Sequence, residues 1–152
     1  MVDSVWSEDE LARLPAWTLV QAYHAVAQGF HALFSEHRLT PVQFGVLAQL
    51  AVSPGLTQAE LARRVLIRPQ SMGELIGSLV DRGLLVRGGP GGKGRPVPVS
   101  LTEQGRSALE QAGTAVRAFN DSAALGLTAK EGSQLNELLH KVIRSRSRPA
   151  GG

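Results

Sequence analysis

Hydrophobic side chains recur every three or four residues along most of the chain, which is the spacing of one buried face of an α-helix. Several of these runs begin at a capping box, in which Ser or Thr is followed three residues later by Glu or Gln. The boxes are Ser7–Glu10, Thr40–Gln43, Thr57–Glu60 and Thr128–Glu131. The sequence therefore predicts a mainly helical fold whose helix starts are marked by their own side chains.

The first predicted helix is short and ends before Pro15, because proline is tolerated only in the first turn of a helix. The helices that follow are predicted over residues 15–37, 41–52, 58–65, 69–82, from 103 to about 119, and 129–144. Between the fourth and fifth of these, residues 84–87 and 97–101 are typical of two short strands, separated by a glycine-rich hairpin. The predicted fold class is mainly α (α+β), as one domain.

Residues 57–82 have the form of a helix-turn-helix unit, in which the second helix presents its N-terminal residues to base edges of DNA. Pro69 at the start of that helix disfavours a helical conformation of Arg68, so the Arg68 side chain is expected to project ahead of the helix. Arginine pairs bidentately with guanine and glutamine with adenine. Exposed polarity without DNA contact is the alternative for Arg68 and Gln70.

Positive charge is concentrated in the same part of the chain. Residues 57–95 hold seven basic and three acidic side chains, a net charge of +4, which leaves −1 for all other residues. This distribution suggests a polyanionic partner, and a solvated surface is the equally weighted alternative. The candidate DNA-contacting residues are Thr57, Gln58, Arg63, Arg68, Pro69, Gln70, Ser71, Glu74, Arg87, Lys93 and Arg95.

Lys93 and Arg95 lie among glycines at the tip of the predicted hairpin. An arginine there can insert into a narrow minor groove, where the negative potential is concentrated. A surface loop without function is the alternative. The glycines also match the letters of a dinucleotide-binding motif, but Pro96 and Pro98 follow where that motif requires a helix.

Other chemistry is not indicated. The chain has no cysteine, which excludes disulfides and thiolate metal sites. His24 and His31 are seven residues apart, about 10 Å along a helix, too far to share a metal directly. We therefore predict no catalytic residues, no metal and no cofactor. Without a basic-then-apolar leader or a run of about 20 apolar residues, a soluble cytoplasmic protein is expected.

The predicted terminal helices, residues 15–37 and 103–145, carry more apolar surface than a body of this size covers, so we expect a homodimer. An intramolecular bundle is the alternative. A polar line also runs beside the apolar stripe of the first long helix. It consists of Trp17, Gln21, His24, Gln28 and His31. This line is a candidate wall of a small-ligand pocket, and a solvated face is the alternative.

Four segments together resemble the MarR family of winged helix-turn-helix regulators, over nearly the whole chain. They are LTPVQFGVL at 39–47, LTQAELA at 56–62, LVDRGLLVR at 79–87 and VSLTEQG at 99–105. The resemblance implies a homodimer that binds a palindromic operator and is released by a small, often aromatic, ligand. It also implies that residues 40–101 form the DNA-binding lobe, that the helix from Pro69 is the recognition helix and that Arg95 is the wing arginine.

The wing departs from the family pattern, which carries Asp-x-Arg nine and seven residues before the Thr of the Leu-Thr pair. Here Lys93 stands in place of the aspartate. The arginine therefore lacks its acidic partner, and the wing is expected to bind more by charge than by fixed geometry. We predict a ligand-responsive, sequence-specific repressor. The alternative is a protein-interaction or ligand-sequestering module that keeps the fold without specific DNA readout.

Overall fold

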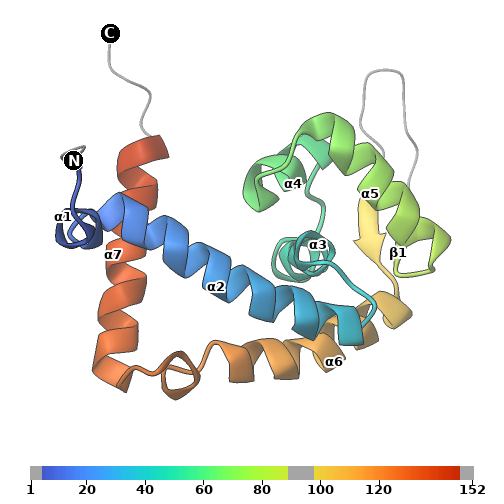
Figure 1. Ribbon diagram of the computed structural model, residues 1–152. Coiled ribbons are helices and arrows are strands. Elements are labelled where there is room, and N and C mark those ends of the chain that lie inside the picture. The colour runs from blue at the N-terminus through green and yellow to red at the C-terminus, as the bar shows by residue number, and fades with distance from the viewer. Residues whose placement is uncertain (1–4, 89–97, 148–152) are drawn as a thin grey trace, which may run out of the picture. The chain divides into compact units, whose positions relative to one another are not determined.

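The computed structural model describes residues 5–88 and 98–147, which fall into two compact units, residues 1–112 and 113–152 (Figure 1). The described residues are mostly helical, with one two-stranded antiparallel sheet. The elements are α1 (Glu8–Ala12), α2 (Pro15–Glu36), α3 (Pro41–Val52), α4 (Gln58–Val65), α5 (Pro69–Asp81), β1 (Leu85–Arg87), β2 (Val99–Leu101), α6 (Glu103–Phe119), a 3-10 turn (Ala123–Leu125) and α7 (Ala129–Ser147). The mainly helical prediction is confirmed.

All four predicted capping boxes are present with both of their hydrogen bonds. At the start of α3, for example, the Gln43 N–H donates to Thr40 Oγ1 (3.1 Å) and the Thr40 N–H donates to Gln43 Oε1 (3.0 Å). The boxes at Ser7, Thr57 and Thr128 have the same two bonds. Each helix start satisfies backbone N–H groups that would otherwise lack a partner.

The ends of elements differ from prediction by a few residues. α7 continues to Ser147, beyond the expected end at Arg144, and β1 begins at Leu85. The second predicted strand is shorter within the described residues, since β2 covers Val99–Leu101. Helix ends fray and strands shorten where pairing is lost, so periodicity locates them only approximately.

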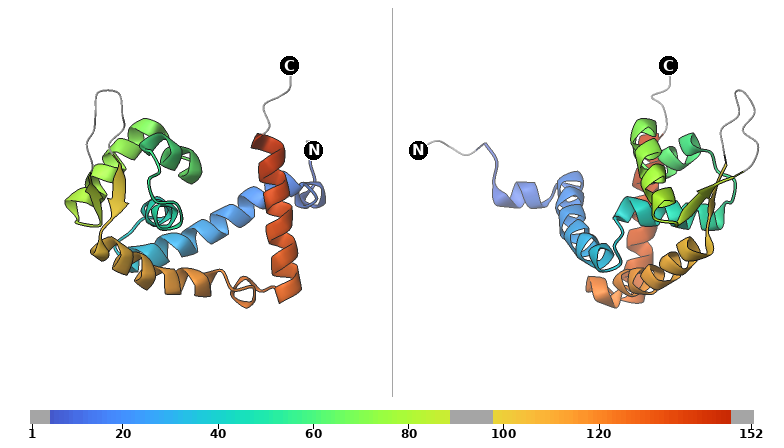
Figure 2. Two further views of the ribbon diagram at one scale, coloured as in Figure 1. Left: turned by 180° about the vertical axis from the view of Figure 1, so that it is seen from behind. Right: turned by 90° about the vertical axis from the view of Figure 1, so that its right-hand side faces the viewer.

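The core of the first unit lies where α3, α4, α5 and the sheet meet (Figure 2). Its largest fully buried side chains are Val46, Leu47, Leu61, Met72, Ile76, Leu79 and Leu85. Val65, on the apolar side of α4, is only half-buried, and at the end of α3 Leu50 is buried whereas Ala51 is exposed. The core thus centres on the two helices of the predicted helix-turn-helix and fixes their mutual orientation.

The sheet closes one side of this core. β1 and β2 pair with Leu85 opposite Leu101 and Arg87 opposite Val99. Gly105, on the first turn of α6, lies against the carbonyl oxygen of Leu84, so closely that a Cβ would overlap that backbone atom. The start of α6 therefore packs directly on the chain entering β1.

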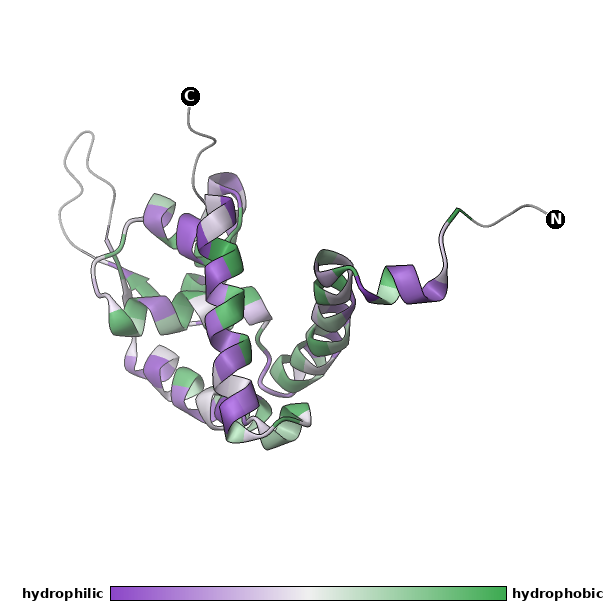
Figure 3. Ribbon diagram, turned by 90° about the vertical axis from the view of Figure 1, so that its left-hand side faces the viewer, coloured by the Kyte–Doolittle hydropathy of each residue, from purple (hydrophilic) through white to green (hydrophobic). Residues whose placement is uncertain are grey.

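The terminal helices are amphipathic and largely exposed. Hydrophobic and hydrophilic residues alternate along α7 (Figure 3). None of its described side chains is buried, and Leu138 and Ile143 are more than half exposed. On α2 only Phe34 is buried, whereas Trp17 and Tyr23 are 46% and 66% exposed. Among the described residues, no helix is both long and apolar enough to cross a membrane.

Candidate nucleic-acid interface

The helix-turn-helix consists of α4 and α5, joined by residues 66–68. A side chain of α4 ties the two helices together, since Gln58 Nε2 donates to the carbonyl oxygen of Pro69 (3.4 Å). Gly73 leaves room for this amide, because a Cβ there would lie 3.2 Å from Gln58 Nε2. Gln58 thus holds the first turn of α5 in place, and its predicted DNA contact remains a prediction.

α5 has one buried and one exposed face. Met72, Ile76 and Leu79 are completely buried against the core, as the sequence predicts. The opposite face at the N-terminal end carries Gln70, Ser71 and Glu74, all exposed. A helix held by its apolar side and free on its polar side is suited to enter a groove with the polar side foremost.

Arg68 is the N-cap residue of α5 and has an extended backbone, with φ −69° and ψ 142°. The extended conformation expected from Pro69 is confirmed, and the Arg68 side chain is exposed. Because the N-terminus of a helix also carries partial positive charge, Arg68 and the free N–H groups behind it favour an anionic partner. We call Arg68, Gln70, Ser71 and Glu74 the recognition face.

The other arginines of this region differ in role. Arg64 is committed to the fold, since its Nη1 donates to Gln49 Oε1 (3.1 Å) and to Ser53 Oγ (3.2 Å). Arg63 and Arg87 are exposed, and within residues 5–88 and 98–147 their side chains form no hydrogen bond or ion pair. They are therefore available for phosphate contacts. Lys93 and Arg95 lie outside the described residues.

Thr57 and Glu60 form the box that starts α4. The Glu60 N–H donates to Thr57 Oγ1 (3.2 Å), and the Thr57 N–H donates to Glu60 Oε2 (2.8 Å). The pKa of Glu60 is lowered, chiefly by the hydrogen bond from the Thr57 N–H and also by the charges of Arg63 and Arg64. Glu60 therefore stabilises the fold above its ordinary pKa of 4.5, and this contribution is lost as the pH falls through the lowered value.

Replacing Thr57 with alanine is expected to lower the free energy of unfolding by about 1 kcal/mol, because an N-terminal N–H of α4 loses its acceptor. Urea unfolding at neutral pH measures this change. Ser78→Ala, at an exposed position of α5 that forms no cap, serves as the control and is expected to stay within about 0.5 kcal/mol. Equal effects of the two substitutions would show that the cap adds nothing.

A cavity of about 310 Å³ lies between α2 and the beginning of α3. Its lining is mostly apolar, with polar groups at Tyr23, His31 and Thr40. The lining residues are Tyr23, Val26, Ala27, Phe30, His31, Thr40, Pro41 and Val42. Behind the wall, the Phe30 ring stacks on Phe34 with centroids 5.7 Å apart, and Phe34 contacts Phe44 in a tilted arrangement with centroids 5.0 Å apart.

Of the polar line predicted along α2, only His31 is among the residues lining this cavity; Trp17, Gln21 and His24 are exposed and lie outside it. The reason is the direction of α2. Its apolar stripe, rather than the polar line beside it, faces α3, so the cavity is walled by Ala27 and Phe30. The cavity therefore lies on a different face of α2 from most of the polar line, whose role as a ligand wall remains a prediction.

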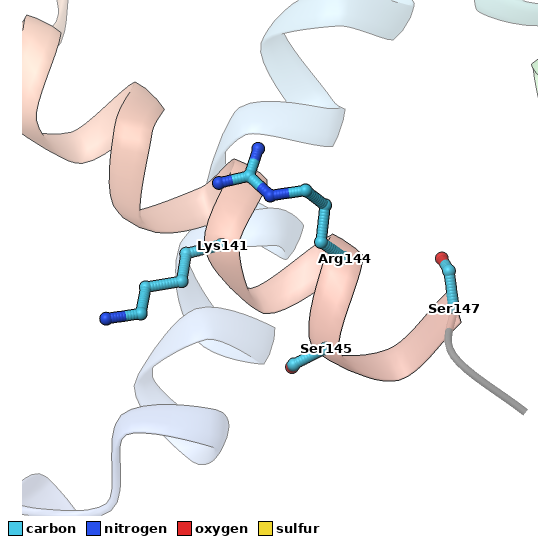
Figure 4. A pocket seen from close by; sticks show the side chains of 4 residues that line it. All are labelled: Lys141, Arg144, Ser145 and Ser147. Atoms are coloured by element: carbon cyan, nitrogen blue, oxygen red, sulfur yellow. The ribbon is translucent and has the colours of Figure 1, made fainter. Parts of the chain in front are cut away.

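A second hollow, of about 510 Å³, lies at the C-terminal end of α7, beside Lys141, Arg144, Ser145 and Ser147 (Figure 4). These side chains point away from one another (Figure 4). Both serine hydroxyls donate to carbonyl oxygens of their own helix, Ser145 to Val142 (2.8 Å) and Ser147 to Ile143 (2.9 Å). The arrangement gives no convergent binding groups. In the described part of the chain, no cluster of three or more His, Asp or Glu is placed to hold a metal.

Comparison with known proteins gives matches over the same elements. A family model described as MarR family matches residues 38–96. The chain is 35% identical over 111 residues to the HTH-type transcriptional repressor Rv2887 of Mycobacterium tuberculosis, covering 73% of this chain and 80% of that protein. It is 29% identical over 125 residues to the homoprotocatechuate degradative operon repressor of Escherichia coli, covering 82% and 84%.

Solved structures extend these matches to the fold. The structure of Rv2887 in complex with DNA has a TM-score of 0.67 at 32% identity, covering 85% of this chain and 98% of that one. The same protein in complex with salicylic acid has a TM-score of 0.68. The transcriptional repressor CouR, bound to p-coumaroyl-CoA, has a TM-score of 0.78 at 29% identity, covering 91% and 97%.

Proposed function

This chain belongs to the MarR family of DNA-binding transcriptional regulators, and we propose that it is a repressor that binds a palindromic operator as a homodimer and leaves it when a small aromatic acid binds. The observation that carries this proposal is the recognition face. Four polar side chains project from the first turns of α5, while Gln58 and the buried apolar side hold the helix in place. We propose no enzymatic activity, and we place the protein with its DNA in the cytoplasm.

The exposed apolar surfaces of the terminal helices support the homodimer. Val20 and Tyr23 on α2 are 43% and 66% exposed, and Leu138 and Ile143 on α7 are 59% and 58% exposed. A second copy would remove such side chains from water, at about 25 cal/mol per Å² of apolar area. Two-fold symmetry would set two recognition helices about 34 Å apart, one turn of DNA, which matches a palindrome. We therefore assign dimerisation to residues 15–37 and 103–145, and DNA reading to 40–101.

The cavity between α2 and α3 is the proposed effector site. Its apolar wall, with Val26, Ala27 and Phe30, suits an aromatic ring, and His31 and Tyr23 offer polar partners for an acid group. The relatives crystallised with salicylic acid and with p-coumaroyl-CoA bind ligands in which a phenolic ring carries an acyl group. We infer that this chain responds to a ligand of that chemical class.

Replacing Ala27 with leucine is expected to weaken the effector response tenfold or more, because the added carbon atoms occupy the cavity. The measurement is the salicylate concentration that releases half of the bound operator. Ala25→Leu, on the same helix but exposed and outside the cavity, is the matched control and should leave the response unchanged. An unaltered response in Ala27→Leu would move the effector site elsewhere.

Titration of the protein against the DNA upstream of its own gene, at physiological salt, tests the function itself. We expect binding to this DNA at least a thousandfold tighter than to bulk genomic fragments, as specific regulators show. Equal affinity for both would favour the alternative, a ligand-binding or protein-interaction module that keeps the fold. Relief of binding by salicylate would then also be absent.

A further inference from the structure

The turn between α4 and α5 holds a leucine in a backbone conformation that leucine rarely adopts. Leu66 has φ 60° and ψ 41°, in the left-handed region, where glycine is the usual residue because it has no Cβ. The backbone itself explains the turn, since the N–H groups of Leu66 and Ile67 both donate to the Ala62 carbonyl oxygen. The leucine side chain is not needed to form it.

The same side chain is 90% exposed, so it contributes almost nothing to the core. Ile67, which follows it, is half-buried. Position 66 therefore combines backbone strain with an exposed apolar side chain, and packing within the chain compensates neither. Such a combination, where glycine would be unstrained, indicates that the side chain acts on something outside the chain.

Leu66 lies two residues before Arg68, the first residue of the recognition face. In a helix-turn-helix the N-terminal residues of the second helix contact base edges, so a side chain just ahead of them is within reach of the same groove. In the major groove, the C5-methyl group of thymine is the apolar group that base edges display. An exposed leucine beside polar reading residues is complementary to that methyl group.

We propose that Leu66 contacts the methyl group of a thymine in each half of the operator and is a specificity-determining residue beside Arg68. The inference rests on the proposed operator binding and adds a base contact to it. Contact removes both apolar groups from water, which favours thymine over a base that lacks the methyl group. A contact with deoxyribose instead would strengthen binding to every sequence equally.

Operators in which single thymines are replaced by deoxyuridine test the contact, because this change removes only the methyl group and keeps the base pair. For the wild-type protein, we expect one position in each half-site where the replacement weakens binding about fourfold, and about fifteenfold when both halves are replaced. Leu66→Gly should bind the thymine and uracil operators equally, at the affinity of the wild type for the uracil operator.

Two further variants test whether the methyl response belongs to the Leu66 side chain. Leu66→Ala keeps the Cβ but removes the rest of the side chain, and it should lose the methyl response as Leu66→Gly does. Val52→Ala truncates another exposed apolar residue (80% exposed), outside the turn, and should keep the response. Thermal unfolding of Leu66→Gly is expected at or above the wild-type temperature, because glycine relieves the left-handed strain.

The possible results distinguish failure of the Leu66 contact from failure of the proposed operator binding. If the wild type prefers its operator over bulk DNA but no uracil position depends on residue 66, the Leu66 contact is wrong and the regulator function stands. If Leu66→Gly weakens binding to the thymine, uracil and bulk DNA alike, the contact is with the DNA backbone and the proposal also fails. If the wild type has no operator preference, both inferences fall.

Discussion

Replacing Arg68 with alanine is expected to weaken operator binding by about 2–6 kcal/mol per dimer, because a bidentate arginine–guanine pair contributes about 1–3 kcal/mol in each half-site. Arg68 is the N-cap residue of α5, held extended by Pro69, and its exposed side chain forms no hydrogen bond or ion pair within the described residues. Stability should therefore be unchanged. Fluorescence anisotropy with operator variants substituted at each G·C pair gives both affinity and base preference.

Two comparisons make the Arg68 result specific. Arg68→Lys keeps the charge but not the planar, two-pronged donor set, so it should retain the salt dependence and lose the guanine preference. Arg106→Ala, an exposed arginine on α6, is the matched control for loss of one positive charge. If Arg68→Ala binds more weakly but retains every base preference, Arg68 contacts phosphate and the recognition assignment is wrong.

Replacing Gly105 with alanine is expected to lower the free energy of unfolding by about 3 kcal/mol, because the new Cβ would overlap the Leu84 carbonyl oxygen, a backbone atom that no side-chain rotation can move. The start of α6 would have to separate from the chain entering β1. Since β1 packs on α5, β1 and the recognition helix should both lose order. Chemical denaturation monitored by circular dichroism measures the loss.

Gly77→Ala is the control for Gly105→Ala. Gly77 also lies within a helix, but a Cβ added there would meet no atom within 4 Å, and its φ is ordinary. Alanine there should stabilise the protein by about 0.5–1 kcal/mol, because it restricts the unfolded chain without a clash. Destabilisation by both substitutions would mean that α-helical glycines are needed here for a reason other than the Leu84 contact.

Patterns among residues close together in the sequence predicted most of the fold. Every capping box is an exchange of hydrogen bonds over three residues, so Thr40 and Thr128 mark helix starts without any knowledge of tertiary contacts. Pro69 acts on its neighbour alone, and the extended Arg68 followed from it. The buried face of α5 was predictable as well, because Met72, Ile76 and Leu79 recur at helical spacing among polar residues.

Features that depend on distant packing were not predictable. α3 is apolar at most positions, so periodicity did not single out Val46, which is completely buried. The cavity depends on how α2 meets α3, which a pattern within α2 alone does not contain. The bond from Gln58 to the Pro69 carbonyl oxygen was not predictable, because it requires both helices to be in place.

The left-handed Leu66 marks a different limit. The sequence places the end of this helix at Val65, but leucine at position 66 does not predict a left-handed backbone, which glycine would adopt without strain. Residue-type preferences describe where each residue is usually found, so they do not predict a leucine in a strained conformation. Such strain occurs at binding surfaces, and it is visible only in the structure.

Hydroxyl-radical footprinting of the upstream DNA tests most directly whether two copies of this chain present paired recognition helices to one duplex. We expect two protected windows, related as an inverted repeat and centred about one helical turn, roughly 10 base pairs, apart. Both windows should appear at the same protein concentration. A single window, or protection spread evenly along the duplex, would contradict the paired arrangement.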